Sequence, residues 1–197
     1  MPVGEAAPPA DDYVLVRGIN REFKNLRRFC RANLTFSKKS EIAKILRFTP
    51  ETHNAVAGTI ADLNMPERFC AVHVRWGDKL IHDADQFYAS DYLKHLPATC
   101  RDLFVLTDDC RAIEGFRGKG LRLHTLVTNE QMGHSTLKRR KRRFSRSELI
   151  QLLAEVQVAG SADFFVGTMS SNLSRYVALL HSNLSNCMSL DRGWHPL

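Results

Sequence analysis

The sequence predicts an α/β fold in which a parallel sheet carries helices on both faces. Three observations support this prediction: short apolar runs recur along the chain, helical patterns separate them, and polar clusters follow three of the runs. The runs are short and almost continuously apolar, as expected of strands buried on both faces. Alternation of such strands with helices is typical of a Rossmann-like domain.

Local signals place the individual elements. The segment Thr49-Pro50-Glu51 offers a capping hydroxyl, a proline suited to the first helical position and an acid for the positive end of the helix. The segment Ser145-Arg146-Ser147-Glu148 is a capping box. We expect helices over 49–63, 86–96, 145–159 and 170–181, a short helix ending near 115, and strands over 69–74, 103–107, 121–125, 163–167 and 187–190.

Composition divides the chain into three parts. Residues 1–12 are rich in Ala and Pro, and we expect them to be disordered; they lack the basic start and apolar centre of a signal peptide. Residues 13–66 form a helical lead-in, and 67–197 form the Rossmann-like domain. No stretch approaches the roughly 20 apolar residues needed to span a bilayer.

The net charge of +7 favours an anionic partner, which could be a nucleic acid, a membrane surface or a diphosphate. Most of this excess lies in the unbroken basic run 138–143. No aromatic side chains for base stacking are interleaved in the run, so a solvated loop or a processing site is favoured over a nucleic-acid site. The five cysteines form no CxxC pair, which argues against a zinc site, and we expect no metal.

Polar clusters follow three predicted strands, and ligands of such folds bind at the carboxyl ends of strands. In the first cluster, 73–79, Arg75 can offer a planar fork of donors to phosphate oxygens. Alternatively, Arg75 only forms a salt bridge where the chain leaves the strand. His73 could be a buried core residue or a site residue. In the second, Asp109 suits a helix cap and Asp108 can order basic groups. In the third, 167–172, small hydroxyl residues open a helix whose backbone N–H groups suit a phosphate.

Taken together, the three clusters resemble the motifs of the α1,6-fucosyltransferases and of the related rhizobial and protein O-fucosyltransferases. The order and spacing agree over about 42–191, and the tail Ser189-Leu190-Asp191 matches the segment that closes the family's donor domain. The motifs stand here as His73-Val74-Arg75-Trp76-Gly77-Asp78-Lys79, Leu106-Thr107-Asp108-Asp109 and Ala162-Asp163-Phe164-Phe165-Val166-Gly167-Thr168-Met169-Ser170-Ser171-Asn172.

The resemblance implies the donor-binding half of a GT-B glycosyltransferase, which transfers fucose from GDP-fucose with inversion to a glycan or glycoprotein, without a metal or another cofactor. His73 and Arg75 would contact the diphosphate, and Arg75 would neutralise the leaving GDP. Further residues match family roles. Glu155 would read the guanine, and Asp83, or Asp85, would be the base, with Lys79 beside it. The remaining donor-binding residues would be Asp108, Asp109, Ser170, Ser171 and Asn172.

Two departures from the family pattern matter. Trp76 stands where the α1,6 enzymes have a second arginine. The segment before the first motif is too short for the family's acceptor domain, so residues 13–66 are either a lead-in or a remnant of that domain, and the chain is either a fragment or a minimal form. A non-catalytic GDP-sugar-binding module is therefore the alternative function. Acceptor, donor sugar and oligomeric state stay open, and a Golgi or other luminal location follows from the resemblance alone.

Overall fold

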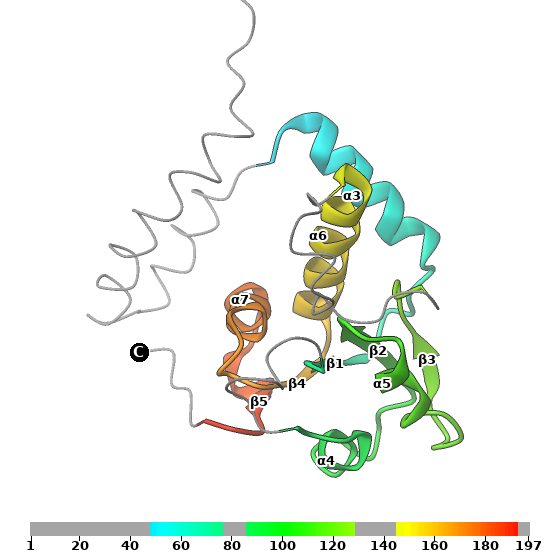
Figure 1. Ribbon diagram of the computed structural model, residues 1–197, viewed down its shortest axis with the longest axis vertical. Helices are drawn as coiled ribbons and strands as arrows, with labels where there is room; N and C mark the ends of the chain where they lie inside the picture. Colours follow the sequence, from blue (N-terminus) through cyan, green and yellow to red (C-terminus); the bar gives the residue numbers. More distant parts are fainter. Residues whose placement is uncertain (1–47, 77–85, 129–144, 193–197) are drawn as a thin grey trace, which may run out of the picture. The chain divides into compact units, whose positions relative to one another are not determined.

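The computed structural model describes residues 48–76, 86–128 and 145–192, which form a five-stranded parallel sheet (Figure 1). The strands are β1 (Cys70–Val74), β2 (Asp102–Thr107), β3 (Arg122–His124), β4 (Phe164–Gly167) and β5 (Cys187–Ser189). Their order is β3-β2-β1-β4-β5, and every neighbouring pair is parallel. This is the strand order of a Rossmann-like sheet, so the predicted fold class is confirmed.

Helices cover both faces of the sheet (Figure 1). On one face, α4 (Ala89–Leu93) contributes Tyr92 and α5 (Arg111–Glu114) contributes Ile113 to an apolar core. The buried side chains of β1 and β2 that point to this face complete the core. On the other face, α6 (Arg146–Ser161) and α7 (Asn172–Leu180) pack on Ala71, Phe104 and Phe165. The short η3 (Leu184–Asn186) leads into β5. Two apolar layers therefore enclose the sheet, which explains its continuously apolar strands.

The N-terminal described helix, α3 (Pro50–Asp62), packs against α6 and buries Val56. Thr49 caps α3 by accepting from the Thr52 N–H, as the sequence predicts. The capping box of α6 is also present, because Ser145 and Glu148 accept from each other's backbone N–H groups. Residues 1–12, and 13–47 of the expected lead-in, lie outside the described residues.

Two helices differ from the sequence-based bounds. Helix α4 is shorter than the predicted 86–96, because the Phe87 carbonyl accepts from the Trp76 indole N–H over 2.8 Å and Asp91 caps the Tyr88 N–H. Helix α7 begins two residues later than predicted, because the backbone of Ser171 is extended and Asp191 binds the N–H groups of Met169 and Ser170 in the turn before it. In both cases a contact distant in sequence overrides the local pattern.

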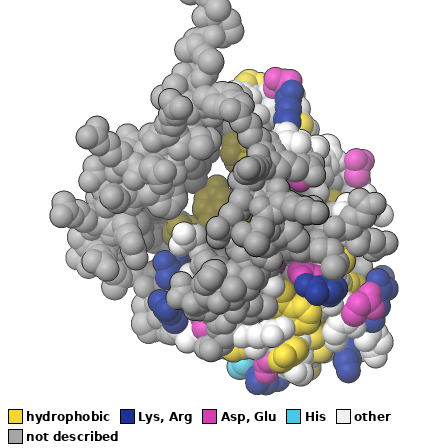
Figure 2. Space-filling model, in the orientation of Figure 1, with side chains coloured by type: hydrophobic (Ala, Val, Ile, Leu, Met, Phe, Trp, Pro, Cys, Tyr) yellow, Lys and Arg dark blue, Asp and Glu magenta, His cyan; other side chains and the backbone are white. Residues whose placement is uncertain are grey.

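On the face that Figure 2 shows, the charged side chains of the described residues are interspersed rather than gathered by sign. Several of them pair: Arg117 with Glu114 at 2.9 Å, Arg122 with Asp102 at 2.7 Å, and Arg146 with Glu51 at 2.6 Å. The basic run 138–143 lies outside the described residues. No helix in the described ranges is long and apolar enough to span a membrane.

Gly167, the last residue of β4, is required by close packing rather than by its backbone conformation. A Cβ there would meet the Ser174 hydroxyl oxygen at 2.7 Å and the Phe165 ring at 2.9 Å. Both neighbours are fully buried, so neither has room to withdraw. By contrast, a Cβ at Gly58, on the exposed side of α3, would meet nothing within 4 Å.

We predict that Gly167→Ala lowers the free energy of unfolding by about 1–3 kcal/mol, because overpacking a filled core displaces its neighbours. The matched control, Gly58→Ala, should instead raise stability by up to about 1 kcal/mol, because alanine is the better helix former. Urea unfolding of both variants measures the difference. Equal stability of Gly167→Ala and the parent chain would contradict the packing at the end of β4.

Candidate functional site

The candidate site lies at the carboxyl edge of the sheet, where the strand order reverses between β1 and β4. In open α/β sheets, ligands bind in the crevice at this switch point, because the chains leaving the two strands turn toward opposite faces. Here β1 leads toward α4 on one face, and β4 leads into α7 on the other. The first and third polar clusters of the sequence therefore flank the switch point.

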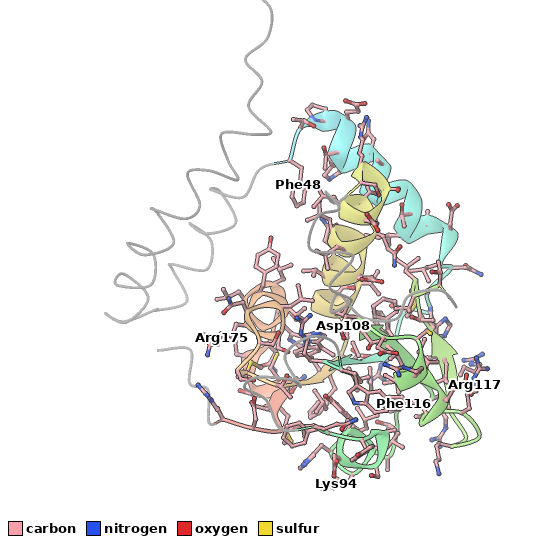
Figure 3. The ribbon with its side chains drawn as sticks, in the orientation of Figure 1. Phe48, Lys94, Asp108, Phe116, Arg117 and Arg175 are labelled. Carbon is pink, nitrogen blue, oxygen red and sulfur yellow. The ribbon has the colours of Figure 1, made fainter. Side chains whose placement is uncertain are left out.

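Arg75 is the first residue after β1, and Asp108 is the first after β2. The Nη1 of Arg75 lies 2.9 Å from Oδ2 of Asp108, whose side chain is only 5% exposed. The other carboxylate oxygen, Oδ1, accepts from the Trp76 N–H over 3.0 Å. Figure 3 shows Asp108 in the middle of the fold, whereas Lys94 and Arg117 point outward. A buried carboxylate thus fixes the direction in which the Arg75 guanidinium leaves the strand.

His73 points from β1 into the layer between the sheet and α7, and it is 1% exposed. Its Nδ1 shares a hydrogen bond of 2.6 Å with the hydroxyl of Ser174, which is also buried. The same hydroxyl oxygen accepts from the Thr168 N–H over 3.2 Å. Ser174 therefore joins the end of β1 to the chain that leaves β4, and it places the first turn of α7 beside the switch point.

Asp109 faces its own helix. Its Oδ1 accepts from the backbone N–H and the Nε of Arg111, over 3.0 and 2.9 Å, and its Oδ2 accepts from the Arg111 Nη2. These hydrogen bonds lower the pKa of Asp109, although burial opposes the shift. Thr107 bonds to the Asp109 N–H and completes the turn. Asp109 is 1% exposed and stands one residue before Cys110, the N-cap of α5, so it binds the first N–H of the helix without being the cap residue itself.

The turn between β4 and α7 is occupied by a carboxylate. Oδ1 of Asp191, two residues beyond β5, accepts from the Met169 N–H over 2.8 Å, and Oδ2 accepts from the Ser170 N–H over 3.2 Å. Ser189 donates to the same carboxylate over 3.0 Å. Burial opposes ionisation of Asp191, but the hydrogen bonds from Ser170, Ser189 and Met169 together lower its pKa. This turn therefore has the geometry to hold an anionic oxygen.

The first turn of α7 follows directly. Ser171 is buried and is the N-cap, but within the described residues its side chain makes no capping hydrogen bond. Ser170 is half-buried and Asn172 is exposed. Arg175 braces the turn from behind, because its Nε donates to the Met169 carbonyl over 2.5 Å. Helix N-termini carry a partial positive charge, so this end of α7 favours a negative ligand.

Glu155 lies away from the switch point, in the middle of α6, and it is 3% exposed. Gln151, one turn earlier, donates to Oε1 of Glu155 and to the Leu126 carbonyl beyond β3, each over 3.0 Å. Burial raises the pKa of Glu155 to about 7, and the hydrogen bond from Gln151 opposes this only in part. Glu155 is therefore a buried acid held beside the segment that follows β3.

At the carboxyl edge of the sheet the structure pairs Arg75 with Asp108, after β1 and β2, and it places Ser170 and Ser171 after β4, with His73 bonded to Ser174. Lys79, Asp83 and Asp85 lie outside the described residues. Sequence reasoning missed Ser174 and Gln151, which orient His73 and Glu155; their only sequence signal is their helical spacing from Ser170 and Glu155. Asp191 was noticed only as part of the closing tail. Within 48–76, 86–128 and 145–192, no three His, Cys, Asp or Glu side chains gather as metal ligands.

Comparisons with known proteins give a likeness of fold. No protein-family model matches the chain, and no curated protein matches it in sequence. Among solved structures, NodZ alpha-1,6-fucosyltransferase co-crystallized with GDP is similar over 75% of this chain and 47% of its own, with 14% identity and a TM-score of 0.48. The same enzyme soaked with GDP-fucose is similar over 71% of this chain and 47% of its own, with 15% identity and a TM-score of 0.42. This chain therefore spans about half the length of NodZ, which resembles it at the level of the fold.

Proposed function

We propose that the carboxyl edge of the sheet binds the diphosphate of a GDP-sugar, and that the chain is the donor half of a fucosyltransferase-type enzyme. One observation carries the proposal: on the two strands that flank the switch point, β1 is followed by the Arg75 guanidinium, which Asp108 holds at 2.9 Å, and β4 is followed by the first turn of α7. An arginine and a helix N-terminus are both groups that bind phosphate oxygens.

The diphosphate would be held from both sides of the switch point. The N–H groups of the first turn of α7 and the hydroxyls of Ser170 and Ser171 would bind the phosphate oxygens on one side. Arg75 would bind them on the other, and its fixed direction would spare the entropy of ordering a long side chain. His73 is buried beneath this seat on Ser174, so it would position the α7 turn. The same role of positioning suits Asp109, which holds Arg111.

The chemistry would be an inverting displacement. The acceptor hydroxyl attacks the anomeric carbon of fucose, the bond to the β-phosphate oxygen breaks, and GDP leaves with the bonding electrons. Charge builds on the departing diphosphate, and Arg75 stabilises that charge in the transition state. The acceptor proton passes to a base, which the motif resemblance assigns to Asp83, or Asp85, with Lys79 beside it. This assignment rests on the sequence, because these residues lie outside the described ranges.

Guanine recognition would fall to Glu155. A carboxylate can accept from the N1–H and the exocyclic amine of guanine together, whereas adenine and uracil lack this pair of donors. Gln151 holds Glu155 by one oxygen at 3.0 Å. Burial raises the pKa of Glu155 to about 7. Because the two N–H donors of guanine favour the charged carboxylate, guanine binding would lower this pKa and release the proton of Glu155.

The alternative is a module that binds a GDP-sugar without transferring it. The same seat for the diphosphate supports this function, and the chain spans about half of each structural neighbour. An assay for transferred fucose, run beside a GDP titration, separates the two functions. Binding with no transfer to any glycan or glycoprotein would favour the module.

We predict that Arg75→Ala weakens GDP and GDP-fucose binding roughly tenfold or more, because a charge-assisted fork to the diphosphate is lost. Arg75→Lys should recover part of the affinity, since it restores the charge but not the fork. A thermal-shift titration measures both, because a ligand at a hundred times its Kd adds about 2.7 kcal/mol of stability. UDP and ADP serve as competing nucleotides.

Arg117→Ala is the matched control for Arg75. It also removes an arginine paired with an acid, Glu114, but its side chain is 63% exposed and points outward (Figure 3). GDP affinity should be unchanged in this variant. Unaltered GDP affinity in Arg75→Ala, with wild-type binding present, would remove Arg75 from the site.

We predict that Glu155 makes stability fall as pH rises. Its pKa is about 7 in the folded chain against 4.5 in the unfolded chain, so the folded state holds the proton more strongly. Stability is therefore highest below about pH 4.5, declines as pH rises to about 7 and is level above that, with a total loss of about 3 kcal/mol. Urea unfolding at about pH 5 and about pH 8 measures this loss.

Glu155→Gln should lack this component of the pH dependence, so its stability relative to the parent chain should rise between the two pH values. Parallel pH profiles of the two proteins would contradict the raised pKa. The same variant should also lower the preference for GDP over UDP and ADP, because an amide cannot accept both guanine donors.

We predict that Asp83→Asn keeps GDP-fucose binding within a few fold but lowers the rate of fucose transfer, typically by 10²–10⁴ for loss of a general base. Thermal shift measures the binding, and release of GDP in the presence of acceptor measures the transfer. Asp85→Asn is the matched variant. A larger loss of transfer in Asp85→Asn would move the role of base to that residue, and full transfer in both would exclude the pair.

A further inference from the structure

The segment after β5 holds the turn between β4 and α7, and the proposed function gives this segment no role. The pairing of β5 with β4 continues past the strand, because the Leu190 N–H donates to the Gly167 carbonyl over 2.9 Å. Asp191 comes next. Its Oδ1 accepts from the Met169 N–H over 2.8 Å, and its Oδ2 accepts from the Ser170 N–H over 3.2 Å. One carboxylate therefore binds two consecutive N–H groups of a turn that lies far from it in sequence.

The turn, residues 168–171, is held from its other side as well. The Nε of Arg175 donates to the Met169 carbonyl over 2.5 Å, and the Ser171 N–H donates to the Thr168 carbonyl over 3.0 Å. The Met169 side chain is 1% exposed and packs in the core on the α7 face of the sheet. Both polar backbone groups of Met169 are therefore bonded, the N–H by Asp191 and the carbonyl by Arg175.

These bonds decide which donors a ligand can use. The N–H groups at 169 and 170 are taken by Asp191, so they are not offered to a ligand. Helix α7 begins at Asn172, and the N–H groups of its first turn, at 172–174, have no acceptor within the helix. The direction in which these N–H groups point depends on the turn before them. A contact that fixes the turn therefore also fixes the donors of the proposed diphosphate seat.

We propose that Asp191 is a positioning residue of the diphosphate seat, because its carboxylate holds the 168–171 turn in the form that presents the first turn of α7 to a ligand. The inference rests on the proposed function for the identity of the ligand, and on the contacts of Asp191 for the role. A turn that is ordered before binding spares the entropy of ordering it in the complex, so the affinity for a phosphate group rises. Asp191 acts through the turn and does not touch the ligand.

A carboxylate near a phosphate site also has an unfavourable effect, since like charges repel. Two N–H groups and the Ser189 hydroxyl, the latter over 3.0 Å, donate to the Asp191 carboxylate. Burial opposes the charged form, but these hydrogen bonds together lower the pKa of Asp191, so its charge is compensated within the fold. We expect the order of the turn to outweigh the repulsion, and removal of the carboxylate then weakens binding. If Asp191 instead occupied the place of a phosphate, its removal would strengthen binding.

The GDP affinity of three proteins tests the role: the parent chain, Asp191→Asn and Asp191→Ala. Isothermal titration calorimetry should show that Asp191→Ala binds GDP roughly tenfold more weakly, a loss of the size of one charge-assisted hydrogen bond. Asp191→Asn should lose less, because its amide oxygen still accepts from one of the two N–H groups. Recovery by asparagine separates the hydrogen bonds from the negative charge, since asparagine is as neutral as alanine.

Asp102→Asn is the matched control. Asp102 is also a buried acid held by partners from a distant segment, Arg122 at 2.7 Å and His124 at 2.9 Å, but it lies at the amino end of β2. This variant should lower the Tm and leave the GDP affinity unchanged. An equal loss of GDP affinity in Asp102→Asn and Asp191→Ala would assign the effect to general destabilisation and overturn the positioning role.

Amide hydrogen exchange tests the contact without any nucleotide. NMR spectra resolve individual N–H groups, and in the parent chain we expect slow exchange at Met169 and Ser170. In Asp191→Ala both should exchange at least several-fold faster. The increase should be larger at Ser170, because the Met169 N–H also donates to the Ser189 hydroxyl over 3.2 Å. Exchange within β2 should be unchanged in this variant.

The inference is also overturned by equal GDP affinity in the parent chain and both Asp191 variants, by tighter binding in Asp191→Ala, or by fast exchange of the Met169 and Ser170 N–H groups in the parent chain. The last result is read on the parent chain, so it stands even if a variant fails to fold. Absence of GDP binding in the parent chain would remove the proposed function. In that case the exchange rates would still show whether Asp191 holds the turn.

Discussion

The arrangement of the site depends on one hydroxyl, that of Ser174. It lies 2.6 Å from the His73 ring and accepts from the Thr168 N–H, so it connects β1 and α7 across the point where the strand order reverses. Gly167 leaves the space that this contact needs, since a Cβ there would lie 2.7 Å from the hydroxyl oxygen. This buried contact places the first turn of α7 beside the end of β1.

Two buried acids, Asp108 and Glu155, lie in opposite electrostatic surroundings. Asp108 is buried but faces the Arg75 guanidinium and the Trp76 N–H, so its charge is compensated within the fold. Glu155 is buried with one amide donor, and burial raises its pKa to about 7. A buried carboxyl with a raised pKa is typical of functional positions. In the proposed complex, guanine would bring two N–H donors to this carboxylate.

The polarity of the sheet separates its polar edge from its apolar edge. Parallel strands place all their carboxyl ends at one edge, and that edge carries Arg75, Asp108 and the 168–171 turn. The amino ends of the strands meet at the other edge, where Cys70 and Cys100 are buried in the apolar core.

The sequence by itself determined the alternation of buried strands and helices, the capping of α3 and α6, and the three strand ends that carry polar residues, because each of these depends on neighbours within a few positions. The tertiary structure decided the rest. Pairing of β1 with β4 brings His73 to Ser174, 101 residues away in sequence, and Asp191 binds the turn before α7 through the Ser170 N–H. Such contacts join segments that meet only when the sheet closes, and no local pattern records which segments will meet.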